Sequence, residues 1–178
     1  GRPSSTRSSS GCFTRTPEPV TGSARGASGG HRPLACTLLA EGLGTMFLLI
    51  GVVGSGIMAQ RLSPTDVGLQ LLQNAMATAG VLVAVITIFG TISADVNPAV
   101  TLGAWALGHR AGREVGPMLV VQVSGGCVGT VVANLMFDLP PIVLSTTTRS
   151  AGHLWLGEAV ATVGLLLVVF SLIRTGRS

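Results

Sequence analysis

The fold of this chain depends on the stretch NPAVTLGAWAL, which occupies residues 97–107. Asn97 is a favourable N-cap and Pro98 follows at the first helical position, so this pair predicts the start of a helix. We expect the helix to stop at Gly108, before His109 and Arg110. At about 1.5 Å per residue it would be roughly 16 Å long, about half of a bilayer core. A half-length apolar helix behind a full-length apolar span predicts a re-entrant element over 97–108, with an ordinary short helix as the alternative.

Composition indicates a membrane protein before any segment is considered. Only 10% of the 178 residues are charged, and 47% are hydrophobic, whereas soluble domains carry about 25% charge. The formal net charge is +4 and comes from arginine, since the chain has no lysine. We do not expect nucleic-acid binding, because no aromatic and basic platform accompanies the arginines. In a membrane protein, basic residues mark cytoplasmic loops instead.

Four long apolar spans occur in the sequence, each long enough to cross about 30 Å of hydrocarbon. They cover residues 34–59, 67–94, 115–137 and 154–173. Glu41 interrupts the first span, and Glu158 lies near the start of the fourth. We therefore predict an all-α membrane protein with four transmembrane helices and one re-entrant half-helix.

Residues 1–33 differ in composition from the rest of the chain. They are rich in Ser, Gly, Arg, Thr and Pro and have almost no large apolar side chains, so they cannot form a packed core of their own. We expect a disordered tail, either a flexible cytoplasmic segment or upstream sequence that is not natively translated. The Arg-rich, Ser-rich and acid-poor composition also fits an organellar transit peptide.

Arginine placement gives the expected orientation in the membrane. With the N-terminus in the cytoplasm and a half-helix that returns to its side of entry, most arginines near the spans lie inside. Those inside are Arg15, Arg25, Arg32, Arg110, Arg113, Arg174 and Arg177, and those outside are Arg61 and Arg149. A half-helix that crossed completely would move Arg110 and Arg113 outside and weaken this bias.

The first and fourth spans begin alike, with AEGLGT at residues 40–45 and GEAVAT at residues 157–162. Three spans separate the two copies, so the second copy must enter from the opposite face, as in an inverted-topology repeat. A carboxylate inside a membrane is costly unless it faces the bundle interior and finds partners. Equivalent positions therefore favour a shared internal role for Glu41 and Glu158, with a glutamate near the membrane interface as the alternative for Glu158 alone. The counterpart of Asn97 in the second copy would lie beyond Ser178, so we expect an incomplete repeat.

These features together resemble the major intrinsic protein family, the aquaporins and glycerol facilitators. The motifs that carry the resemblance are AEGLGT at 40–45, ISADVNPAVTLG at 92–103, Gln122 in the third span, and Glu158 with Thr162. The resemblance covers about residues 38–175. It implies an aquaporin-like right-handed helical bundle, truncated to the first repeat and the opening helix of the second.

The resemblance also implies roles for individual residues. Asn97 would donate from its side-chain amide to a water or hydroxyl oxygen at the pore midpoint. Pro98 would start the half-helix there, and Ala99 would pack against the opposing loop. Glu41 and Glu158 would accept hydrogen bonds from the re-entrant loops.

Further implications concern the loop and the surroundings of the channel. Gln122 and Asp95 are expected to support the re-entrant loop. The expected partners are the lipid bilayer, water or small neutral solutes, and further copies in the tetramer usual for the family. The cell membrane is the expected location. Neither catalysis nor a cofactor is implied, and three scattered cysteines and three scattered histidines predict no metal site.

Two departures from the family pattern stand out. The approach Ser93-Ala94-Asp95-Val96 is one residue shorter than usual, and Asp95 replaces the usual histidine. Thr78 falls at the second-span position that is aromatic in strict water channels. A small hydroxyl there suggests a wider constriction, compatible with glycerol or neutral metalloid hydroxides, although Thr78 is equally compatible with an ordinary packing role.

Two functions follow as alternatives from these observations. The first is a passive channel for water or small neutral solutes. The second is a pore-less membrane fragment with a structural role or no transport role, because one half-helix cannot close a pore within a single chain. Four long apolar spans disfavour a third possibility, a soluble helical bundle.

Overall fold

The computed structural model describes residues 33–144 and 150–175, which contain five α-helices and no strand. The helices are α1 (Leu34–Leu62), α2 (Val67–Phe89), α3 (Pro98–Ala106), α4 (Gly112–Met136) and α5 (Gly152–Arg174). The predicted tail, residues 1–33, lies outside the described residues apart from Pro33. The prediction of an all-α fold is confirmed.

The four predicted membrane spans correspond to α1, α2, α4 and α5. Each is long and apolar enough to cross a membrane, with a mean hydropathy of 1.6 to 2.3 over a stretch of 18 residues. The fifth helix, α3, has nine residues, which is too short to cross. The predicted set of four membrane-length helices and one short helix is therefore confirmed.

Helix ends differ from the predicted bounds, most of all at the C-terminus of α2. We predicted that this span would continue to Ala94, but the helix ends at Phe89. Val96 has a φ of +39°, which no right-handed helix contains. The backbone N–H groups of Asp95 and Val96 instead donate to Glu41 of α1. These long-range bonds replace the helical ones, so the segment after Phe89 becomes a loop.

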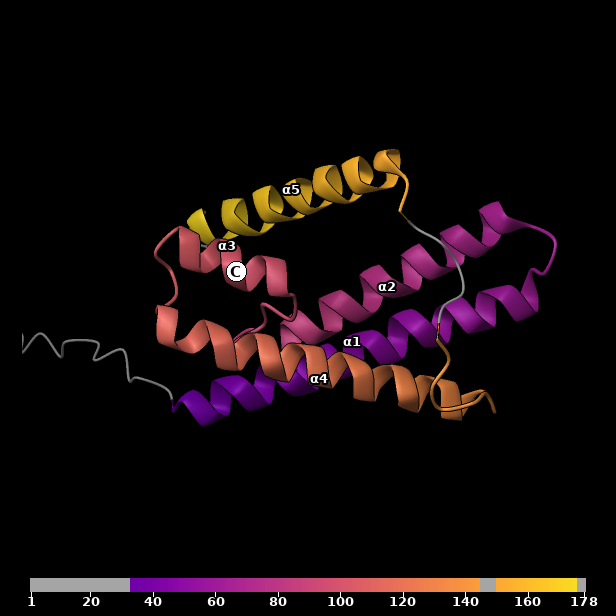
Figure 1. The fold of residues 1–178 in the computed structure, drawn as a ribbon, viewed down its shortest axis with the longest axis horizontal. Helices are drawn as coiled ribbons and strands as arrows, with labels where there is room; N and C mark the ends of the chain where they lie inside the picture. Colours follow the sequence, from indigo (N-terminus) through magenta and orange to yellow (C-terminus); the bar gives the residue numbers. More distant parts are fainter. Residues whose placement is uncertain (1–32, 145–149, 176–178) are drawn as a thin grey trace, which may run out of the picture. The chain divides into compact units, whose positions relative to one another are not determined.

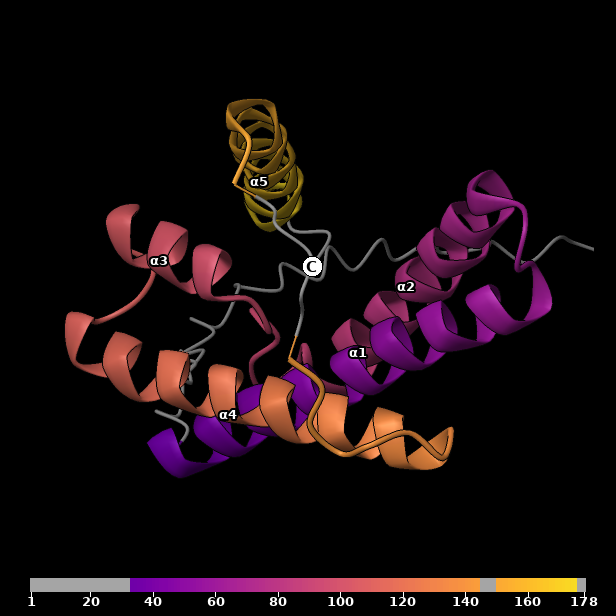
Figure 2. The same cartoon turned by 45° about the vertical axis from the view of Figure 1, so that its right-hand side comes forward.

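Helix α1 packs against both α2 and α4, and α3 contacts α4 and α5. In Figure 1, α1 and α4 run in the same direction, and α2 and α5 run in the opposite direction. The start of α1, the end of α3 and the start of α4 lie toward the same end in both views (Figures 1 and 2). Figure 1 shows the end of α5 toward that end as well. The opposite directions of α1 and α5 agree with the inverted relation expected from their sequences.

Two glycines of α4 allow its backbone to touch that of α1. A Cβ atom at Gly125 would lie 2.3 Å from the carbonyl oxygen of Gly42, and one at Gly129 would lie 2.4 Å from that of Met46. Real Cβ atoms do not approach oxygen so closely, so the two backbones are in contact only because both positions lack a side chain. Small residues in this spacing are the usual means of close helix packing in lipid.

We expect Gly125→Ala to destabilise the protein by about 1–3 kcal/mol, because the added methyl must push α1 and α4 apart. Gly80→Ala is the matched control, since Gly80 lies in the interior of α2 and no atom of the described residues outside its own helical backbone lies within 4 Å of its Cβ position. The control should be neutral or slightly stabilising, as alanine favours helix. Thermal unfolding in detergent, followed by circular dichroism, measures both. Equal melting temperatures for the two variants would contradict the packing account.

The interior between α1, α3 and α4 is unusually polar. Within the described residues, the largest side chains with under 2% exposure are Met118, Gln122, Glu41 and Thr101. Three of these four are polar and require hydrogen-bond partners when buried. Most large apolar side chains of α2 and α5 are exposed instead, as expected for surfaces that face lipid. The polar interior surrounds the loop that leads into α3.

Candidate functional site

The half-helix α3 begins at Pro98, directly after Asn97, as the sequence predicted. Asn97 is its N-cap, with an extended backbone, and Pro98 occupies the first helical turn. The Asn97 Oδ1 atom accepts a hydrogen bond from the Ala99 N–H at 2.8 Å. The side-chain Nδ2 amide therefore faces away from the helix start, and within the described residues it has no hydrogen-bond partner.

The start of α3 lies midway along the neighbouring helices. Asn97 and Pro98 line a cavity of about 690 Å³ together with Leu48 and Leu49 of α1 and Gly126 of α4. These positions are close to the middles of α1 and α4. From there α3 runs to the end of the bundle where α4 begins (Figure 1). A helix N-terminus, with its partial positive charge, thus faces a cavity halfway along the bundle.

Glu41 holds the loop before α3. Its side chain is fully buried. Oε1 accepts from Ser93 Oγ at 2.5 Å and from the Asp95 N–H at 2.9 Å. Oε2 accepts from the Val96 N–H at 2.8 Å and from Gln122 Nε2 at 2.8 Å. Each oxygen therefore accepts two hydrogen bonds, which is the full capacity of a carboxylate. The donors come from two segments, the loop before α3 and helix α4.

Val96 shows that this loop is held under strain. Its φ of +39° is a genuine outlier for a β-branched residue. Such a conformation costs about 1–3 kcal/mol and persists only where the surroundings enforce it. Val96 is buried, its N–H is bound to Glu41, and its side chain lies where a Cβ on Gly44 would be. The glutamate and the packing against α1 together keep the residue before Asn97 in this conformation.

A second set of bonds joins the loop to α3 and α4. Gln122 Nε2 also donates to Thr101 Oγ1 at 2.9 Å, and Thr101 Oγ1 donates to Asp95 Oδ2 at 3.1 Å. Arg110 forms an ion pair with Asp95 at 3.2 Å and donates to Ser93 Oγ at 2.7 Å. Since a carboxylate has no hydrogen to donate, the bond to Glu41 fixes which end of the Gln122 amide is nitrogen. Gln122 Oε1 is then buried without a partner in the described part of the chain.

Two predicted site residues lie elsewhere. Thr78 is half-buried on α2 and donates to Asn74 Oδ1 at 3.1 Å, and it is not part of the wall of the cavity at Asn97. Glu158 is exposed on α5, and among the described residues it has no hydrogen-bond partner. The roles of Thr78 at a constriction and of Glu158 beneath a loop stay predictions.

Sequence reasoning missed three members of the loop network, namely Ser93, Thr101 and Arg110. Ser93 and Thr101 lie within the motif that carried the family resemblance, but the sequence gives no sign of their partners. Arg110 was considered only as one of the arginines that indicate the orientation in the membrane. A rule that each buried carboxylate needs donors could have directed attention to hydroxyl and guanidinium groups near Asp95, though not to particular residues.

Comparison with known proteins supports the family resemblance that the sequence motifs indicated. Residues 31–178 match the family model described as Major intrinsic protein. The chain belongs to this family. Together with the four apolar helices, the match shows that this major intrinsic protein is a multi-pass membrane protein.

Three relatives illustrate the similarity. Aquaglyceroporin AqpS of Rhizobium meliloti is 43% identical over 140 residues, which cover 78% of this chain and 60% of the relative. Probable aquaporin AqpM of Archaeoglobus fulgidus is 33% identical over 102 residues, 53% of this chain and 42% of the relative. Aquaporin Z of Photorhabdus laumondii is 35% identical over 96 residues, 53% of this chain and 41% of the relative. The chain thus matches about two fifths to three fifths of each relative's length, and no solved structure matches it.

Proposed function

We propose that the chain supplies the Asn97 half-helix of a channel that conducts water and small neutral solutes passively across a membrane. The observation that carries this proposal is the position of Asn97, at the N-terminus of a nine-residue helix that starts midway along α1 and α4 and borders a cavity. Relatives named aquaporin and aquaglyceroporin support it.

The chemistry of this site suits neutral, hydroxyl-bearing molecules. Asn97 Oδ1 is occupied by the helix cap, so the Nδ2 amide supplies donors for a passing water or hydroxyl oxygen. Leu48 and Leu49 supply apolar wall. Their side chains have no hydrogen-bonding groups, so they do not compete with the Asn97 amide for the permeant molecule. The positive end of the α3 dipole opposes cations and so helps to block proton conduction. Transport of this kind needs neither catalysis nor a cofactor.

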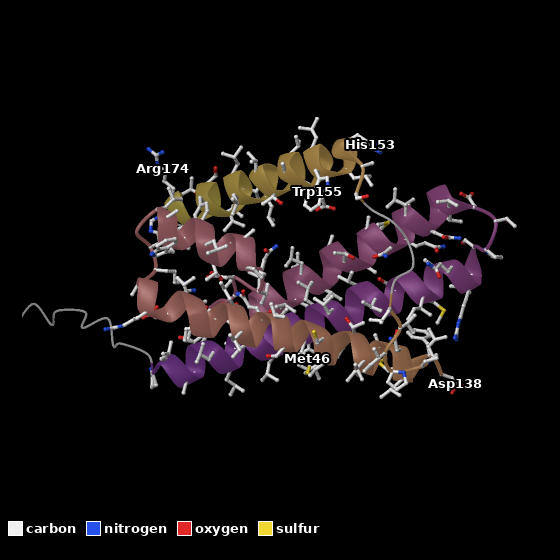
Figure 3. All side chains as sticks on the ribbon, viewed as in Figure 1. Met46, Asp138, His153, Trp155 and Arg174 are labelled. Atoms are coloured by element: carbon white, nitrogen blue, oxygen red, sulfur yellow. The ribbon has the colours of Figure 1, made fainter. Side chains whose placement is uncertain are left out.

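Charge at the helix ends favours a cell-membrane location with the N-terminus in the cytoplasm. Arg110 lies between α3 and α4, Arg113 lies in the first turn of α4, and Arg174 ends α5. Figure 3 shows Arg174 at the end of α5 nearest α3, with His153 and Trp155 at the other end. Arg61 lies at the opposite end of α1 from Leu34. Arginines concentrate on the cytoplasmic side of membrane proteins, so the end that holds the start of α1 is assigned to the cytoplasm.

The remaining proposed roles rest on the family resemblance. Thr78 would widen the constriction toward glycerol-sized or metalloid hydroxide solutes. Glu158, which is exposed in this chain, would support a second re-entrant loop as Glu41 supports the first. The family's tetramer is the proposed assembly.

Proteoliposomes test the proposal directly. Vesicles that contain the purified chain are mixed with a hyperosmotic solution, and shrinkage and re-swelling are followed by stopped-flow light scattering. We expect water or glycerol permeability severalfold above that of empty vesicles, without increased proton leakage. Permeability equal to that of empty vesicles for both solutes would show that this chain alone forms no channel and would favour the pore-less alternative.

A further inference from the structure

We infer that Arg110 is a positioning residue for Asn97 and acts through Asp95 and Ser93. That the position of Asn97 matters for transport rests on the proposed function. That Arg110 controls this position is argued from a closed circuit of side-chain hydrogen bonds that Arg110 completes.

The circuit contains six side chains from five segments of the chain. Arg110 Nη2 donates to Ser93 Oγ at 2.7 Å, and Ser93 Oγ donates to Glu41 Oε1. Gln122 Nε2 donates both to Glu41 Oε2 at 2.8 Å and to Thr101 Oγ1 at 2.9 Å. Thr101 Oγ1 donates to Asp95 Oδ2 at 3.1 Å. Arg110 Nη2 also donates to Asp95 Oδ1 at 3.2 Å, which closes the circuit. The circuit therefore ties α1, the loop before α3, α3 itself, the turn after α3, and α4 to one another.

Charge balance makes Arg110 essential to this circuit. The circuit holds the carboxylates of Glu41 and Asp95 and the single guanidinium of Arg110. This is the one ion pair found in residues 33–144 and 150–175, and its side chains are only 21% and 15% exposed. Removing one partner of a desolvated pair is costly because the other charge is left without compensation. Without Arg110, Asp95 would keep one side-chain donor, Thr101, and would be drawn toward water.

The turn after α3 explains why Arg110 faces the loop. Gly108 has a φ of +77°. Its N–H donates to the Trp105 carbonyl at 3.0 Å, and the His109 N–H donates to the Ala104 carbonyl at 2.8 Å. This is a Schellman motif, in which a glycine in the left-handed region reverses the chain at a helix C-terminus. The reversal brings Arg110 back against the loop.

The effect of Arg110 reaches Asn97 through two residues. Asp95 is followed by Val96, whose positive φ is strained, and then by Asn97. If the Asp95 side chain is released, the strained φ of Val96 is held only by the bonds to Glu41 and the packing against α1. Relaxation of Val96 toward an ordinary negative φ then becomes easier, and it would rotate the peptide that leads into Asn97. The amide of Asn97 would then leave its position at the cavity. Arg110 thus stabilises the loop conformation that presents Asn97.

The test combines a double-mutant cycle with a direct view of Asn97. The variants are Arg110→Gln, Asp95→Asn, the double variant and Arg110→Lys, with Arg113→Gln as matched control because Arg113 is exposed in the next helical turn. The first readout is the ¹⁵N–¹H resonance of the Asn97 side-chain amide in nanodiscs. The second readout is glycerol permeability in proteoliposomes.

We expect Arg110→Gln to shift the Asn97 resonance and to lower permeability about tenfold, the factor that corresponds to one lost charged hydrogen bond. The double variant should be no worse than Arg110→Gln, because the two residues act together. Arg110→Lys should recover part of the loss, and Arg113→Gln should behave as wild type.

Three outcomes would overturn the inference. They are an unshifted Asn97 resonance in Arg110→Gln, additive losses in the double variant, and unchanged permeability of Arg110→Gln in a channel that conducts. If wild-type vesicles are no more permeable than empty ones, the proposed function fails, but the Asn97 resonance still decides whether Arg110 positions that side chain. If wild type conducts glycerol and Arg110→Gln conducts it equally well, the inference about Arg110 fails while the proposed function stands.

Discussion

Glu41→Ala is expected to destabilise the protein by about 3–5 kcal/mol, the range for breaking one side of a buried charged network. The substitution removes both carboxylate oxygens and leaves four donors unpaired, two of them backbone N–H groups. Each buried donor without a partner costs about 1–3 kcal/mol, although relaxation of the loop recovers part of the sum. Val96 also loses the bond that helps to hold its strained backbone. Thermal unfolding in detergent measures the effect.

Glu158→Ala is the matched control for this prediction. It makes the same chemical change within a similar local sequence, GEAVAT instead of AEGLGT, but at an exposed site without a hydrogen-bond partner in the described residues. We expect no measurable loss of stability for Glu158→Ala. Glu41→Gln should fall between the two, since an amide keeps one acceptor oxygen but presents two hydrogens to neighbouring donors. A small effect for Glu41→Ala, comparable to that of Glu158→Ala, would contradict the account of the buried network.

The sequence was informative where the pattern is local. The length and hydropathy of the spans predicted four membrane-length helices, and the Asn97-Pro98 pair predicted the start of α3, because caps and apolar runs depend on neighbouring residues. The C-terminal end of α2 was predicted less well. An apolar run shows no break at Phe89, since the break comes from bonds to Glu41, which is distant in sequence.

The loop network depends on contacts that the sequence does not display. Arg110 and Arg113 are both arginines near the same turn, but Arg110 pairs with Asp95 whereas Arg113 is exposed on α4. Likewise, Glu41 and Glu158 share a local pattern but not an environment, because one lies between α1, α3 and α4 and the other lies on an exposed face of α5. A short motif therefore identifies the residue type that a site requires, while the packing of distant helices decides whether that residue is used.

Asn97→Asp is expected to lower the permeability to water and glycerol about tenfold or more while α3 keeps its start. Aspartate caps a helix as well as asparagine does, and its oxygen can accept the Ala99 N–H as Asn97 Oδ1 does at 2.8 Å. The negative charge also interacts favourably with the helix N-terminus, by about 0.3–1 kcal/mol. However, the amide hydrogens that would bind a permeant oxygen are lost. The aspartate carboxylate can only accept hydrogen bonds, and its charge binds water strongly. Stopped-flow permeability and helical content are measured on the same preparation.

Comparison with Asn97→Ala separates the two roles of the side chain. Alanine removes both the cap and the amide, so it should lower stability by about 1 kcal/mol as well as reduce permeability. Aspartate should reduce permeability without that loss of the cap. The carboxylate should also weaken the barrier to cations, because it opposes the positive end of the α3 dipole. If Asn97→Asp conducts water and glycerol like wild type, the amide makes no contact that transport requires, and the position of Asn97 would then serve only to start the helix.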